Sequence, residues 1–373
     1  MTKFLSAVLC ASGFLAAFAA GGPSSSDAIV KLINSRASGS RREFAEAAKI
    51  VAADAKAGRP LHQFVIALVA NDRDLPRELQ MDRNTRRKYL DQSRDKIRRL
   101  AEEKNNGLAW YLLSLEKNDM SFLKRAADVE NVQALNAWAT ITLTDALKNP
   151  AMETNEVERV LAKCFGCFKK AADMGDANGL YNLGMCHMRG YGCAQDQDLA
   201  YKCFRASAEA GHPESINNVG GFYRDGIVVR RNLETATKWF ARSAGLGNAY
   251  GMLNYALALQ RGEGVEKDVD KAVGLLKEAA ELGNAEAMNV YGMCYYTGDG
   301  VKKDEAEAVK WFRASAVRGF PQAMDNLSSC YSRGTGVRKD EKEGLVWKVR
   351  GMAARGDRNA AAWLQQNGHP LIP

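Results

Sequence analysis

Eight cysteines are the residues of this 373-residue chain with the widest range of possible chemistry. Cys164 and Cys167 have the Cys-x-x-Cys spacing of a redox motif, but they fall inside an expected helix, away from the helix start that would stabilise a thiolate. Unreactive cysteines are among the residues most often buried. We therefore expect the seven cysteines beyond Cys10 to pack in the core, with disulfides as the open alternative because export would permit them.

The other residue types that could form a reaction centre show no supporting pattern. The four histidines are scattered, with no His-x-x-x-His pair and no Cys₂His₂ spacing, so no metal site is expected. Gly-x-Gly recurs, but no Lys-Ser or Lys-Thr follows it and no strand is expected before it, so it does not indicate a phosphate-binding loop. The residues predict no catalytic group, no metal and no cofactor.

The first twenty residues have the pattern of an export signal. Lys3 supplies a positive start, residues 4–20 are uncharged and largely apolar, and Ala17-Phe18-Ala19 offers a small-x-small cleavage site. We predict cleavage after Ala19 and a secreted or periplasmic protein without a membrane span; a retained membrane anchor is the alternative. Loss of Lys3 would lower the formal net charge from +8 to about +7. We expect such an exported basic protein to meet anionic envelope components and no nucleic acid.

The second half of the chain repeats every 36 residues. Two glycine columns lie two residues apart, with one valine in the second, and an Asp or Asn column follows. The columns are Gly190, Gly226, Gly262, Gly298 and Gly334; Gly192, Val228, Gly264, Gly300 and Gly336; and Asp196, Asn232, Asp268, Asp304 and Asp340. Glycine tolerates the positive φ of a helix end, and Asp or Asn caps the next helix. Each copy therefore predicts two helices joined by a turn.

These hairpins have to be packed against one another. A hydrophobic content of 46% with 26% charged residues is that of a globular chain. A single helical hairpin cannot bury its apolar face alone, so neighbouring hairpins must stack. The predicted fold is all-α, a right-handed α-solenoid of stacked helix–turn–helix repeats.

Several short motifs of the repeat resemble those of a known family. Asn182-Leu183-Gly184, Tyr291-Gly292 with Gly298-x-Gly300-Val301, and Trp311-Phe312 are similar to the pattern of the Sel-one-like repeat (SLR) family, relatives of the tetratricopeptide repeats. The resemblance covers residues 177–356. It implies a scaffold or adaptor that binds other proteins or peptides. Some cysteine-rich secreted members are described as penicillin-binding or β-lactamase-like, so a β-lactamase-like or peptidoglycan-amide hydrolase is the alternative. Its serine mechanism would need a Ser-x-x-Lys run.

The repeat boundaries predict an organisation in six segments. We expect a signal peptide at 1–19, a flexible leader at 20–40, a helical N-terminal cap at 41–106, degenerate repeats at 107–176, five repeats at 177–356, and a C-terminal capping helix with a tail at 357–373.

The expected binding site is the concave face, which the first helices of such hairpins line in related solenoids. Aromatic, Met and Arg side chains favour interface cores. By analogy, the outward-facing positions are Tyr181, Met185, Arg189, Asn217, Arg224, Tyr250, Asn289, Tyr296, Asp325 and Arg333. A further column comprises Asn182, Asn218, Asn254 and Asn326. Its amides could clamp the backbone of an extended peptide, or they could bond adjacent repeats to each other, and both hypotheses stay open.

Overall fold

A computed structural model describes Ile29, Leu32 and residues 41–57, 60–70, 75–149 and 151–372. The predicted signal peptide and most of the predicted leader lie outside the described residues. The described part is all-helical, without strands, and its helices pack as consecutive pairs in an α-solenoid array. Within this part, no helix combines the length and the apolar character that crossing a bilayer requires.

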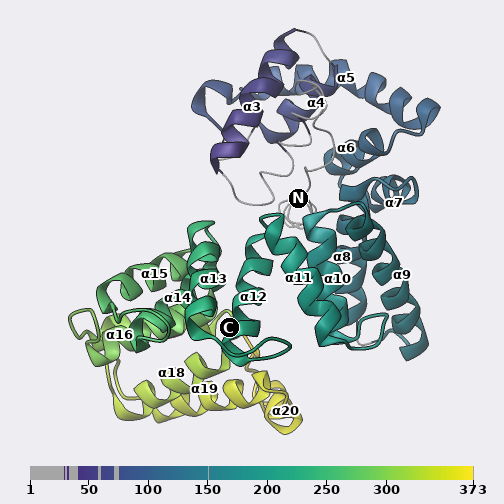
Figure 1. The fold of residues 1–373 in the computed structure, drawn as a ribbon. Helices are drawn as coiled ribbons and strands as arrows, with labels where there is room; N and C mark the ends of the chain where they lie inside the picture. The colour runs from purple at the N-terminus through teal and green to yellow at the C-terminus, as the bar shows by residue number, and fades with distance from the viewer. Residues whose placement is uncertain are drawn as a thin grey trace. The chain divides into compact units, whose positions relative to one another are not determined.

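The chain divides into two units, Met1–Ser215 and Ile216–Pro373. In the first unit, each helix packs on the next one along the chain. Three helices and a short 3₁₀ turn precede three hairpins (Figure 1). The elements are α3 (Arg41–Lys56), α4 (Pro60–Val69), η1 (Arg77–Leu79), α5 (Arg83–Lys104), and the pairs α6 (Gly107–Lys117) with α7 (Met120–Asp128), α8 (Val132–Lys148) with α9 (Thr154–Asp173), and α10 (Ala177–Arg189) with α11 (Gln197–Glu209).

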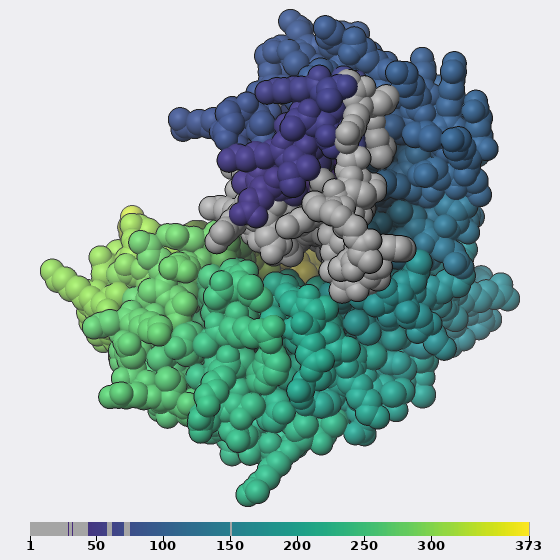
Figure 2. Space-filling view, turned by 45° about the horizontal axis from the view of Figure 1, so that its top comes forward, coloured from purple at the N-terminus to yellow at the C-terminus, as the bar shows by residue number. Residues whose placement is uncertain are grey.

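The second unit continues the hairpin pattern to a final helix. Its helices from α13 onward pack consecutively, and the green part of the chain forms a continuous surface of packed side chains (Figure 2). Helix α12 (Pro213–Asp225) begins in the last residues of the first unit and lies mostly in the second. The others are α13 (Leu233–Gly245), α14 (Ala249–Arg261), α15 (Val269–Glu281), α16 (Ala285–Thr297), α17 (Glu305–Ala316), α18 (Pro321–Arg333), α19 (Glu341–Ala354) and α20 (Arg358–Gln366).

The capping residues of the repeat act as the sequence predicts. Every member of the Asp/Asn column accepts a hydrogen bond from the backbone N–H three residues on, as in Asp268 Oδ1 to Lys271 N at 3.0 Å. Gly190, Gly262, Gly298 and Gly334 end their helices in the left-handed conformation. These caps satisfy backbone groups that a helix end otherwise leaves unpaired. Helix pairs in this register are therefore confirmed.

The second glycine column brings each turn against the preceding hairpin. A Cβ added at Gly264 would lie closer than 3.0 Å to the backbone of Leu233, at the start of α13, and one at Gly336 would meet the backbone of Glu305 in the same way. Only glycine permits this approach at positive φ. Val228 occupies this column with φ 65° and is 42% exposed. A β-branched residue in this conformation is strained.

In the hairpins α10–α11 and α16–α17, an aromatic ring on the second helix packs against a small residue of the first. An added Cβ at Gly184 would meet the Phe204 ring at 2.8 Å, and one at Gly292 would meet Phe312 at 2.9 Å. Both phenylalanines are fully buried. The prediction that the small column marks close helix approach is confirmed.

Candidate functional site

Within each unit, one side of the array is formed by the first helices of successive hairpins. Helix α8 contacts α10 in the first unit, and α14 contacts α16 in the second. Among the described helices, successive second helices such as α13 and α15 make no comparable contact. The first helices α16 and α18 make no comparable contact either, so we place the first helices on the inner side by analogy with related solenoids. We call this side the inner face.

All fourteen predicted binding residues lie on first helices. Four of them, Arg189, Arg224, Tyr250 and Arg333, are exposed, and nine are half-buried. Asn289 is the exception, because its side chain is buried, and the expectation that it faces outward is wrong. The positions are Tyr181, Asn182, Met185 and Arg189 on α10; Asn217, Asn218 and Arg224 on α12; Tyr250 and Asn254 on α14; Asn289 and Tyr296 on α16; and Asp325, Asn326 and Arg333 on α18.

Half of the asparagine column bonds adjacent repeats to each other. Asn254 Nδ2 donates to Asn217 Oδ1 at 2.8 Å, and Asn326 Nδ2 donates to Asn289 Oδ1 at the same distance. The second bond explains why Asn289 is buried. For these two members the stacking hypothesis is confirmed, because their amides already bond a neighbouring first helix. With the residues that the structure describes, Asn182 and Asn218 make no such inter-repeat bond.

Two charged residues of the inner face are already ion-paired. Arg224 Nε lies 2.8 Å from Asp225 Oδ1, and this contact raises the pKa of the guanidinium and lowers the pKa of the Asp225 carboxyl. Asp325 pairs with Arg355, the residue that follows α19. Arg189 and Arg333 remain exposed, and no ion pair holds them in the described part of the chain. The inner face therefore offers two unpaired guanidinium groups, one in each unit.

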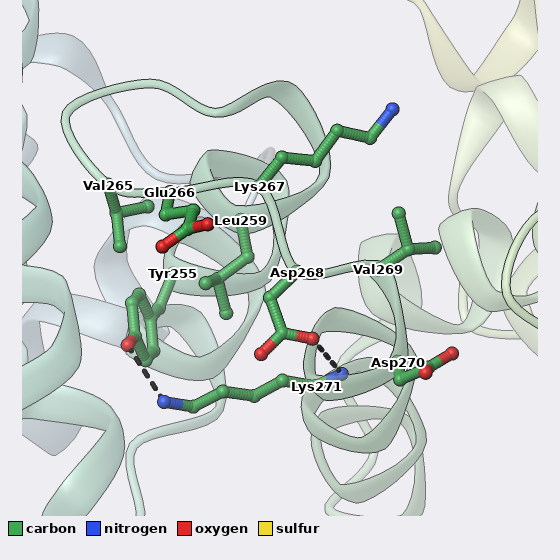
Figure 3. Close-up of a pocket in the computed structure, with 9 residues that line it drawn as sticks. All are labelled: Tyr255, Leu259, Val265, Glu266, Lys267, Asp268, Val269, Asp270 and Lys271. Atoms are coloured by element: carbon green, nitrogen blue, oxygen red, sulfur yellow. Dashed lines mark hydrogen bonds between the residues drawn. The ribbon is translucent and has the colours of Figure 1, made fainter.

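A cavity of about 500 Å³ opens in the second unit between the turn after α14 and the start of α15 (Figure 3). Tyr255 Oη accepts a hydrogen bond from Lys271 Nζ at 3.1 Å, and Asp268 Oδ1 accepts one from the Lys271 backbone N–H at 3.0 Å. We call this cavity the Tyr255 pocket. Its lining residues are Tyr255, Leu259, Val265, Glu266, Lys267, Asp268, Val269, Asp270 and Lys271.

Sequence reasoning missed this pocket, although the repeat contained a signal for it. Leu259 stands in the column that holds Tyr223, Tyr295 and Tyr331 in three other copies. Leu275 stands in the column of Trp239, Trp311 and Trp347. Residues 249–284 therefore form the one copy of the five with leucine in both aromatic columns. Of these two leucines, Leu259 lines the pocket, at a position where three other copies hold a tyrosine ring.

A family model for the Sel1 repeat matches residues 154–176, 177–212, 213–248, 249–284, 285–319 and 321–347, which together make up more than half of the chain. The chain belongs to the Sel1 repeat family. The match at 154–176 adds a sixth repeat segment in the region predicted to hold degenerate repeats. Sel1 repeat proteins are generally protein-interaction scaffolds that bind other proteins, and they are generally not enzymes.

Two of the solved structures that are similar to this chain are both repeat proteins of this kind. A Sel1 repeat protein from Oxalobacter formigenes is 27% identical, with a TM-score of 0.51 over 63% of this chain and 100% of that one. The second is c5321, a protective antigen present in uropathogenic Escherichia coli strains and displaying an SLR fold; it is 25% identical, with a TM-score of 0.53 over 86% of this chain and 67% of that one. A comparison with curated proteins gives no match.

The Ser-x-x-Lys spacing that a β-lactamase-like mechanism needs does occur in this Sel1 repeat protein. In two of the runs, the serines Ser93 and Ser114 are fully buried and donate to a backbone carbonyl of their own helix. In the third, Lys124 Nζ lies 3.1 Å from Asp128 Oδ2. No run therefore joins an open hydroxyl to an unpaired lysine. The runs are Ser93–Lys96, Ser114–Lys117 and Ser121–Lys124.

A serine and a histidine also meet at the start of α12. His212 Nδ1 accepts from the Ser215 backbone N–H at 3.3 Å, and its Nε2 lies 2.8 Å from Asn178 Oδ1. Burial lowers the pKa of His212, and Glu214, 3.5 Å away, opposes that shift. Ser215 is completely buried and donates to Ser207 Oγ at 2.7 Å. Since no substrate can reach this hydroxyl, the cluster serves as a helix cap.

The seven cysteines from Cys164 to Cys330 are free thiols. Burial raises the pKa of Cys164 and of Cys186 to about 12, and burial also raises the pKa of Cys167. A thiol with a raised pKa forms little thiolate at neutral pH and is a poor nucleophile. Cys164 and Cys167 lie within α9, as expected, so their spacing does not form a reactive pair.

Proposed function

We propose that this Sel1 repeat protein is an exported scaffold that binds peptide or protein segments on its inner face. One observation supports this proposal above the others: aromatic and cationic side chains stay exposed on helices whose other faces are buried. Tyr250 is 58% exposed on α14, and Arg189 and Arg333 are exposed near the ends of α10 and α18. Tyrosine and arginine are the side chains that contribute most binding energy in protein interfaces.

The test compares two single variants with matched controls in capture from an envelope extract. Arg189→Glu and Arg333→Glu reverse the inner-face charge of the first and second unit, respectively. Lys202→Glu on α11 and Lys277→Glu on α15 make the same charge change on exposed second-helix positions. The proposal predicts that the arginine variants lose a captured protein that the lysine variants retain. Equal capture by all four variants would show that the inner face is not the binding surface.

Export is the second part of the proposal, and it rests on Lys3, the uncharged run and the Ala17-Phe18-Ala19 site. The intact mass of the protein purified from its native host tests it. Cleavage after Ala19 would leave a mature chain that begins at Ala20 in the secreted or periplasmic fraction. A full-length chain in the membrane fraction would instead support a retained anchor.

A further inference from the structure

The other repeats of the chain show what fills the space that the Tyr255 pocket leaves open. In the copy at residues 285–320, Tyr295 stands in the position of Leu259. The Tyr295 hydroxyl lies 3.2 Å from that of Tyr291, and the two rings meet edge to face with centroids 5.1 Å apart. Trp311 makes a second edge-to-face contact with Tyr291, also at 5.1 Å. The Tyr295 phenol therefore packs beside Tyr291 on the same helix, and Tyr291 makes the contact to the second helix.

The pocket retains the partner of this phenol but lacks the phenol itself. Tyr255 occupies the position of Tyr291, and its ring and hydroxyl line the cavity (Figure 3). Leu259 is fully buried and ends short of the space that a tyrosine would reach. The remaining apolar wall comes from Val265 and Val269. The pocket thus offers a ring, a hydroxyl and two valines against which an aromatic side chain of a partner can pack.

The charges around the pocket favour a cationic group beside that ring. Glu266, Asp268 and Asp270 supply three carboxylates against two ammonium groups. The Lys271 ammonium is engaged by the Tyr255 hydroxyl at 3.1 Å, and the side chain of Lys267 extends away from the cavity in Figure 3. The lining therefore carries one net negative charge, and opposite charge attracts.

We propose that the Tyr255 pocket binds a tyrosine side chain flanked by basic residues on a protein partner. The bound ring takes the place that Tyr295 holds in the neighbouring repeat, with its hydroxyl next to that of Tyr255. This inference rests on the proposed function in one respect only, that the ligand is a protein segment. It concerns a pocket formed by α14, α15 and their connecting turn, and none of its lining residues belongs to the predicted inner-face set.

The experiment titrates the whole protein with the tripeptide Ac-Lys-Tyr-Lys-NH₂ and follows the amide resonances by NMR. A single ring in an open pocket predicts a Kd on the order of 1 mM. Leu259→Tyr fills the pocket with the side chain that three sibling repeats use, and it should weaken binding at least about 10-fold. Leu282→Tyr adds the same ring at a position in the same repeat that is 60% exposed, and it should bind like the wild type.

Two more measurements test the tyrosine ring of the peptide and the charge of the pocket separately. Ac-Lys-Ala-Lys-NH₂ should bind at least about 10-fold more weakly because it has no ring. Glu266→Lys changes an exposed rim residue without touching the core, and it should weaken the Lys-Tyr-Lys peptide about threefold and favour Ac-Glu-Tyr-Glu-NH₂.

Several outcomes would overturn the inference. These are no saturable binding up to about 20 mM, equal binding of the alanine peptide, or a folded Leu259→Tyr protein that binds like the wild type. If Leu259→Tyr does not fold, an unchanged affinity of Glu266→Lys for both charged peptides would count against the proposal. The arginine variants of the inner face keep this pocket intact, so their result is independent of this one.

Discussion

Two glycines of one turn separate the effect of backbone conformation from the effect of repeat stacking. Gly262 and Gly264 have nearly equal φ angles, 70° and 68°. An added Cβ at Gly262 would have Lys267 Cβ as its nearest contact, at 3.6 Å, whereas at Gly264 it would overlap the backbone of Leu233. Both alanine variants therefore carry the same conformational strain. Only Gly264→Ala forces the turn away from the preceding hairpin.

The magnitudes follow from this difference. An L-residue at positive φ costs about 1 kcal/mol, which is the expected loss for Gly262→Ala. Overlap with a backbone that cannot move aside adds about 1–3 kcal/mol, so Gly264→Ala should lose about 2–4 kcal/mol. A change of 1 kcal/mol shifts Tm by about 2–4 °C in a domain of 150–250 residues. Gly262→Ala should therefore lower Tm by about 2–4 °C, and Gly264→Ala by about 4–16 °C.

Thermal unfolding monitored by circular dichroism at 222 nm provides the assay, with urea unfolding as a second measurement. Repeat arrays can unfold in more than one step, so the comparison uses the transition that both variants shift. Equal Tm values for Gly262→Ala and Gly264→Ala would refute the argument. They would show that the turn does not pack against the preceding hairpin as the structure has it.

Three further changes test other contacts. Asn254→Ala removes the side-chain hydrogen bond between adjacent first helices and should lower the free energy of unfolding in urea by about 1 kcal/mol. Asn218→Ala breaks no such bond and should lower it by less than about 0.5 kcal/mol. Similar losses for the two variants would contradict the stacking role of Asn254. Val228→Gly relieves a valine held at φ 65° and should stabilise the protein by about 0.5–1 kcal/mol, and destabilisation would count against strain at this turn. Burial lowers the pKa of His212 from its ordinary 6.5, so the folded state binds fewer protons than the unfolded state. The free energy of unfolding should therefore decrease as the pH falls below about 6.5, where the unfolded state takes up a proton that the folded state does not. His212→Asn introduces a capping residue that does not titrate, and the urea midpoint of the wild type should fall more between about pH 8 and pH 5 than that of the variant; parallel midpoints would exclude His212 as the cause.

Features that recur in every copy could be predicted from the sequence, because each has a local physical cause. Asp268 caps α15 whatever lies nearby, since its carboxylate needs only the backbone N–H three residues on. Gly262 ends α14 because glycine has no Cβ to oppose positive φ. Helix positions, the pairing of helices and the stacking of hairpins follow from such residues.

Features that depend on the neighbouring repeat could not be assigned in the same way. Asn289 and Asn217 belong to one column, but Asn289 is buried and Asn217 is only half-buried, because burial also depends on the surrounding side chains. Arg224 was predicted as an outward-facing contact, and its guanidinium is already paired with the residue beside it. The Tyr255 pocket is lined by Leu259 where three other copies hold a tyrosine, and that difference is visible only when the copies are compared column by column.

The most direct test of the proposed binding surface is site-specific photo-crosslinking in the native host. A benzophenone amino acid replaces Tyr250 on α14, which is 58% exposed on the inner face, and, in a second strain, Leu282 at the end of α15, which is 60% exposed. Because both sites are equally accessible, chance collisions label them equally. The proposed function predicts a discrete protein adduct from position 250 that position 282 does not give. The same adducts from both positions, or an adduct from position 282 alone, would contradict the inner face as the surface that binds a partner.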